Sequence, residues 1–194
     1  MDAYEVLLFL HVSSVAFWLG AALLIEILVF RAERQRDAAA VRRLFDELNA
    51  LDPIFLPATL LVLATGVLLT IDGPWSFGDL WIALGLVGFA FIYLYGFLYM
   101  EPQVKRVRAV AEDERGLGPQ AQALVRRFFT LWRVETVVLL LLVFDMTVKP
   151  SGDDVATLVF MAGVFVASSA YLLWRAGSVN VGGTPSHRGG SSLR

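Results

Sequence analysis

The sequence predicts an all-α membrane protein, a polytopic bundle of five transmembrane helices with the N-terminus outside and the C-terminus in the cytoplasm. Of the 194 residues, 57% are hydrophobic and only 18% are charged, which is too apolar a composition for an ordinary soluble domain. The apolar residues gather in runs close to the ~20 residues that a helix needs to cross a hydrocarbon core. The basic residues gather in every second connection between these runs and after the last run. The composition and the apolar runs predict the class, and the placement of the basic residues predicts the orientation.

Five apolar runs are the expected membrane-spanning segments. They cover residues 6–30, 53–71, 80–100, 128–148 and 155–174. Because lipid offers no hydrogen bonds to the backbone, each run should be helical. The first run follows a start without Lys or Arg, which disfavours a cleavable signal peptide. We expect residues 1–175 to form the bundle and residues 176–194, rich in Gly and Ser, to be a disordered cytoplasmic tail.

The basic residues occupy three segments, all on the same side of the predicted bundle. They are Arg31, Arg34, Arg36, Arg42 and Arg43, then Lys105, Arg106, Arg108, Arg115, Arg126 and Arg127, and finally Arg175, Arg188 and Arg194. The connections on the other side contain only Lys149. The positive-inside rule therefore places the two long loops and the tail in the cytoplasm.

The first long loop contains a predicted surface helix. Val41, Leu44, Phe45 and Leu48 have the spacing of an amphipathic helix, and Asp52-Pro53 is typical of the start of the next helix. In the same way, Glu101-Pro102 predicts the end of the third spanning helix. The pentapeptides 41–45 and 125–129 are alike (VRRLF and VRRFF), which would fit two hairpins of common origin. The favoured alternative is that basic residues followed by aromatic ones are simply common where a helix starts on the cytoplasmic side.

His11 is the first candidate for chemistry. With Ser14, Trp18, Ala22 and Glu26 it forms one helical stripe that should face the bundle. It is the only histidine within a predicted span, and a neutral imidazole is a good metal ligand and a proton carrier near neutral pH. The alternative is a histidine that only packs and hydrogen-bonds.

Four further residues share the depth of His11 near the outer end of the bundle. They are Asp145, Met146, Lys149 and Met161. Asp145 and Lys149 are four residues apart and are expected to pair, unless one of them faces His11. Methionine and histidine together can hold haem iron, and thioethers suit monovalent copper, although methionines are also common core residues.

Toward the inner end, Glu26 is expected to reach Arg133 and Glu135. An ion pair that stabilises the bundle is the main expectation, and a proton relay is the alternative.

Several functions are excluded by what the chain lacks. Without cysteine it can form no disulfide, thiolate metal site, iron–sulfur cluster or covalent haem linkage. It contains no phosphate-binding loop or catalytic triad, and its arginines are topology determinants rather than a nucleic-acid surface.

Three short segments resemble a family of uncharacterised bacterial integral membrane proteins. They are residues 10–20 (LHVSSVAFWLG), Thr65-Gly66 and residues 145–150 (DMTVKP). That family is similar to the CopD-like copper-resistance membrane proteins and the HemJ-like protoporphyrinogen oxidases, and the resemblance covers about Tyr4 to Pro150.

The resemblance implies that His11 matches the first-helix histidine implicated in haem binding in HemJ-like proteins. The HemJ pattern also has an essential lysine near the third helix, but no Lys or Arg occurs between Leu44 and Val104. This difference argues against porphyrinogen oxidation and against an enzyme of that kind. CopD-like copper handling would suit His11 and the outer methionines.

The sequence therefore favours a multi-pass protein of the bacterial plasma membrane that binds b-type haem around His11. Copper is the less favoured ligand. The alternatives are a non-catalytic subunit or scaffold that binds a membrane protein or a second copy of itself, and a small transporter using Glu26, Glu135 and His11 for protons. The lipid bilayer is the one partner common to all three.

Overall fold

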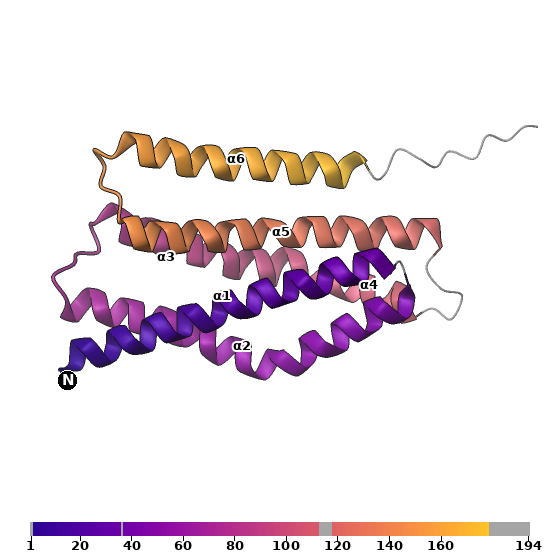
Figure 1. The fold of residues 1–194 in the computed structure, drawn as a ribbon, viewed down its shortest axis with the longest axis horizontal. Helices are drawn as coiled ribbons and strands as arrows, with labels where there is room; N and C mark the ends of the chain where they lie inside the picture. The colour runs from indigo at the N-terminus through magenta and orange to yellow at the C-terminus, as the bar shows by residue number, and fades with distance from the viewer. Residues whose placement is uncertain (1, 36, 113–117, 179–194) are drawn as a thin grey trace, which may run out of the picture.

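The computed structural model describes residues 2–35, 37–112 and 118–178, without the side chains of residues 51, 52, 120 and 178 (Figure 1). Every regular element in this part of the chain is helical. The elements are α1 (Ala3–Gln35), α2 (Ala38–Asp72), α3 (Leu80–Leu94), the π-helical turn η1 (Tyr95–Met100), α4 (Glu101–Glu112), α5 (Pro119–Val148) and α6 (Val155–Ser178). The all-α prediction is confirmed.

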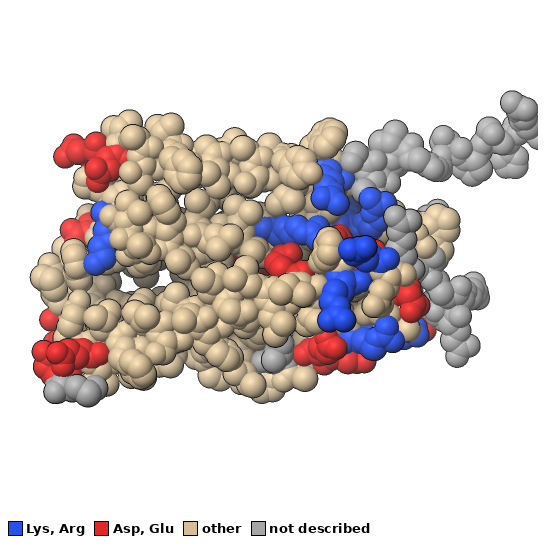
Figure 2. All heavy atoms as spheres, viewed as in Figure 1, with Lys and Arg blue, Asp and Glu red and all other residues tan. Residues whose placement is uncertain are grey.

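The helices lie side by side in an elongated bundle. α1 packs along α2, α3 packs along α5, and α6 covers the side of α5 that faces away from α1 (Figure 1). α1 also contacts α5 and thereby joins the α1–α2 pair to the group formed by α3, α5 and α6. Arginines and lysines gather at one end, which we call the basic end, while the N-terminus of α1 lies at the opposite end (Figure 2).

Four segments of the described chain are long and apolar enough to cross a membrane: Ala3–Gln35, Pro53–Asp72, Leu80–Glu112 and Val155–Gly177. These match four of the five predicted spans. α5 is not among them, because Arg133, Glu135 and Asp145 interrupt its apolar half. Large apolar side chains such as Phe9, Val87 and Trp174 are exposed along the bundle, as expected for a surface that faces lipid.

Two predicted helix ends are wrong. α2 continues through Pro53 and Pro57, so the surface helix and the second span form one bent helix (Figure 1). The third span does not end at Glu101-Pro102 but runs through η1 into α4. The N–H of Glu101 bonds to the carbonyl of Gly96 in a π-helical turn, and this shift in the bonding pattern admits a proline that cannot donate a hydrogen bond.

A tightly packed core lies at the basic end. Its fully buried side chains include Val41, Val107 and Phe129, from α2, α4 and α5. The two similar pentapeptides meet here, since the rings of Phe45 and Phe128 are 5.8 Å apart. A second cluster around Trp18 fills the middle of the bundle.

α6 begins with a local cap at the end opposite the basic residues. The backbone N–H and hydroxyl of Ser151 both donate to Asp154, at 2.7 and 2.9 Å, which lowers the pKa of that exposed carboxyl. α6 continues to Ser178, so the tail predicted from residue 176 begins as helix. The rest of the predicted tail, residues 179–194, lies outside the described residues.

Candidate functional site

His11 lies on the face of α1 that turns toward α2. Ser14 and Trp18, one and two turns further along, are buried, and Glu26 contacts α5, so the predicted stripe does face the bundle. The Ser14 hydroxyl donates to the carbonyls of Leu10 and His11 in its own helix. The imidazole of His11 itself contacts α2.

The His11 ring is fixed by one of its two nitrogens. Nδ1 lies 3.2 Å from the carbonyl oxygen of Val62 and 3.0 Å from the Thr65 hydroxyl oxygen. The Thr65 hydroxyl donates its own proton to the carbonyls of Leu61 and Val62. Both neighbours of Nδ1 therefore act as acceptors, which favours the tautomer with the proton on Nδ1 and a lone pair on Nε2. Among the described residues, Nε2 has no hydrogen-bond partner.

Gly66 lets the imidazole approach the backbone of α2. A Cβ atom at this position would lie 3.2 Å from Cε1 of His11, closer than most side chains tolerate. The pair Thr65-Gly66 therefore forms the seat of the ring, one residue by hydrogen bonding and the other by its lack of a side chain.

Asp145 is buried against α3, near the C-terminal end of α5. It has no exposed surface, and within the described structure neither carboxylate oxygen has a hydrogen-bond partner. Its neighbour Met146 packs against Gly85 so closely that a Cβ there would overlap the Met146 methyl group. An unpartnered carboxylate in an apolar bundle is costly, so this residue carries a large desolvation penalty.

The expected pairing of Asp145 with Lys149 is wrong. Lys149 ends α5 in the left-handed conformation (φ 53°), and its N–H bonds to the backbone carbonyl of Asp145 rather than the carboxylate. This turn carries the ammonium group over two tryptophan rings, 4.0 Å from the centroid of Trp75 and 5.1 Å from that of Trp81. Cation–π contacts replace the predicted ion pair.

The expected donors come from different parts of the bundle, with His11 on α1, Met146 and Lys149 at the end of α5, and Met161 on α6. No hydrogen bond joins His11 to Met146, Met161 or Lys149 in the described part of the chain, and Met161 lies half-buried on α6. The described residues also hold no group of three or more His, Asp or Glu side chains placed to bind a metal ion.

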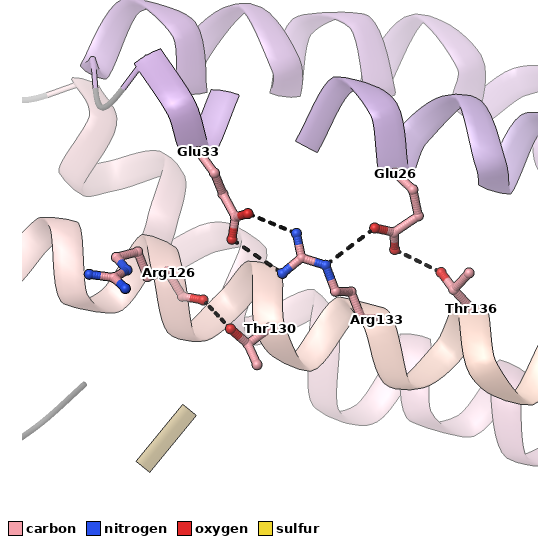
Figure 3. Close-up of polar contacts among 6 residues, drawn as sticks. All are labelled: Glu26, Glu33, Arg126, Thr130, Arg133 and Thr136. Carbon is pink, nitrogen blue, oxygen red and sulfur yellow. Dashed lines mark hydrogen bonds and ion pairs between the residues drawn. The ribbon is translucent and has the colours of Figure 1, made fainter. Parts of the chain in front are cut away.

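A second polar site joins α1 to α5 closer to the basic end (Figure 3). Arg133 of α5 lies between two glutamates of α1, with its Nε 3.5 Å from Glu26 and an Nη 2.8 Å from Glu33. Thr136 donates to the other oxygen of Glu26 at 2.8 Å. The predicted pair of Glu26 with Arg133 is present, whereas Glu33 was missed, although it lies seven residues after Glu26 and hence on the same helix face.

Glu135 does not join this cluster. It lines a small cavity of about 50 Å³ in the middle of the bundle, together with Trp18, Phe55 and Trp132. In the described structure it makes no hydrogen bond or ion pair. The prediction that Glu26 reaches both Arg133 and Glu135 therefore holds only for the arginine.

Comparison with known proteins agrees with the membrane class. A family model described as predicted integral membrane protein (DUF2269) matches residues 5–150, whereas no curated protein and no solved structure matches the chain. The matched range includes His11, its seat at Thr65-Gly66, and Asp145. The similarity to CopD-like and HemJ-like proteins stays a prediction. Because the family model matches well over half of the chain, the chain belongs to this family of integral membrane proteins.

Proposed function

We propose that the protein binds b-type haem through Nε2 of His11. The observation that carries the proposal is the hydrogen bonding of the imidazole, whose Nδ1 is held by Val62 and Thr65 while Nε2 keeps a free lone pair. Histidines that ligate metals characteristically donate their other N–H to a backbone carbonyl or a similar acceptor, which fixes the tautomer and the ring orientation.

The donor set favours haem over a bare copper ion. A porphyrin would itself supply most of the ligands of its iron, so the protein would have to provide only one or two. Copper would need several protein donors close together, and the described residues hold no group of three or more His, Asp or Glu side chains placed to bind a metal ion. With no cysteine in the chain, the haem would be held without covalent attachment.

Figure 2 shows a gap in the surface in the half of the bundle where α1 begins, and His11 belongs to that half of α1. When bound, the haem would supply electron transfer, while His11 would hold the iron and Thr65 would keep the ring in place. Met146, Met161, Lys149 or a second copy of His11 from another chain are the candidates that would hold the group together with His11.

The test is an absorbance spectrum of protein produced with ample haem and purified in mild detergent. We expect a Soret band in the wild type and its loss in His11→Ala, since this variant removes the only intramembrane imidazole. His187→Ala, which changes the only other histidine, is the matched control and should keep the band. Added imidazole should restore it in His11→Gly.

A wild-type protein with a full helical circular-dichroism spectrum but no Soret absorbance would contradict the haem proposal. That result would favour the second class of function, a scaffold that binds other membrane proteins or copies of itself.

We also propose that α5 crosses the membrane as a fifth span, with the basic end in the cytoplasm of a bacterial plasma membrane. The ion pairs of Arg133 offset part of the cost of inserting its charges, and the basic residues gather at one end as the positive-inside rule requires (Figure 2).

Cysteine labelling in intact cells tests this orientation, with a background free of native cysteine. Ser76→Cys and Ser151→Cys should react with a membrane-impermeant maleimide, because both residues are exposed at the outer end. Ala39→Cys and Arg127→Cys at the basic end should react only after the cells are opened. Labelling of Ala39→Cys in intact cells would reverse the assignment.

A further inference from the structure

A polar groove lies at the basic end, between the last turns of α1 and the first turns of α2. It has a volume of about 160 Å³, room for several water molecules at ~30 Å³ each. Ala32, Ala40 and Leu44 form its buried floor, and longer polar side chains form its rim. The rim includes Arg31 of α1 and Arg43 and Glu47 of α2.

The two arginines of the rim have no carboxylate partner within the described structure. Arg31 makes no hydrogen bond or ion pair there, and Arg43 makes only a long contact of 3.4 Å to the Gln35 side chain. By contrast, Arg108 and Arg133 are ion-paired. Two unpaired guanidinium groups beside one groove form a site for an oxyanion, because their planar N–H groups match phosphate oxygens.

Glu47 adds a negative charge to the same groove. It follows Arg43 by one helical turn, yet it forms no ion pair with any described residue. A simple anion would be repelled by this carboxylate, whereas a group carrying both charges would satisfy all three side chains.

An apolar track leads away from the groove along α1. Leu28 lines the groove, and Ile27 and Leu24, four and seven residues before Arg31, are 57% and 50% exposed. Residues with this spacing share one helix face. A ligand with its polar group in the groove would thus find an apolar surface for a hydrocarbon chain directly beside it.

We propose that this groove binds a phospholipid whose headgroup carries a phosphate and a primary ammonium group. Arg31 and Arg43 hold the phosphate, Glu47 accepts the ammonium, and an acyl chain follows Ile27 and Leu24. The site is independent of the haem proposal, because it lies at the opposite end of α1 from His11 and involves none of the same residues.

Native mass spectrometry of the full chain with defined lipids tests the proposal. We expect phosphatidylethanolamine to bind more tightly than phosphatidylglycerol or phosphatidylcholine with the same acyl chains. Arg31→Gln and Arg43→Gln should each weaken its binding by about tenfold or more, since each removes charge-assisted hydrogen bonds. Arg34→Gln is the matched control and should bind normally, because Arg34 lies over Phe30 and not in the groove.

The Glu47→Gln variant distinguishes the two halves of the headgroup. It should lose the preference for phosphatidylethanolamine and bind phosphatidylglycerol at least as well. Equal lipid binding by Arg31→Gln, Arg43→Gln and Arg34→Gln would overturn the proposed site. Displacement of the lipid by inorganic phosphate at similar concentration would also overturn it, since the apolar track would then contribute nothing.

Discussion

Replacing Arg133 with methionine is expected to lower the free energy of unfolding by about 3 kcal/mol. The guanidinium contacts Glu26 and Glu33 in a partly buried position, and methionine keeps most of the side-chain volume while leaving both carboxylates without their counter-charge. The effect can be measured as a shift in the unfolding curve in detergent, followed by tryptophan fluorescence, because Trp132 lies next to Arg133 in the chain.

Arg126→Met on the same helix is the control for this prediction. Arg126 is exposed, and its side chain contacts neither glutamate (Figure 3). The combined variant Glu26→Gln, Glu33→Gln, Arg133→Met should recover much of the lost stability, since no buried charge then lacks a partner. A single Arg133→Met variant as stable as Arg126→Met would show that the cluster does not hold α1 to α5.

Replacing Asp145 with asparagine is expected to have the opposite effect and raise the free energy of unfolding by about 1–3 kcal/mol. Asp145 is fully buried and its carboxylate oxygens have no partner in the described structure, so a neutral amide of the same shape removes the cost of burying a charge. Thermal unfolding in detergent measures the shift.

Asp154→Asn provides the contrast, because it removes a carboxylate that accepts two hydrogen bonds from Ser151 and should not stabilise the protein. If Asp145→Asn instead lowers stability, the carboxylate interacts with a group outside the single chain, such as a bound ligand or a second copy.

The sequence predicted the helical class well because apolar runs of membrane length have few alternatives in lipid. It also predicted the inward stripe from His11 to Glu26, since side chains three or four apart share a helix face whatever the partner helix. The predicted helix boundaries at Pro53 and Pro102 were wrong. Proline lowers the stability of a helix locally, but packing on both sides of it decides whether the helix continues.

The partners of the site residues were harder to predict. The pairing of Asp145 with Lys149 assumed a regular helix through both residues, but α5 ends at Val148, and the left-handed conformation of Lys149 turns its side chain toward Trp75 and Trp81. The contacts of His11 with Val62 and Thr65 depend on how α1 and α2 are aligned along their length. No pattern within either helix specifies that alignment.

The continuity of α2 links its two ends mechanically. Pro53 and Pro57 cannot donate the usual hydrogen bonds, so the helix is most compliant between its section at the basic end and its membrane section. The first section is packed into the core through Val41 and Phe45, while the second holds His11 through Val62 and Thr65. A force applied at the basic end would bend α2 at the two prolines, and they would absorb part of the displacement before it reached the imidazole. The two prolines thus partly separate movements of the basic end from the position of the His11 ring.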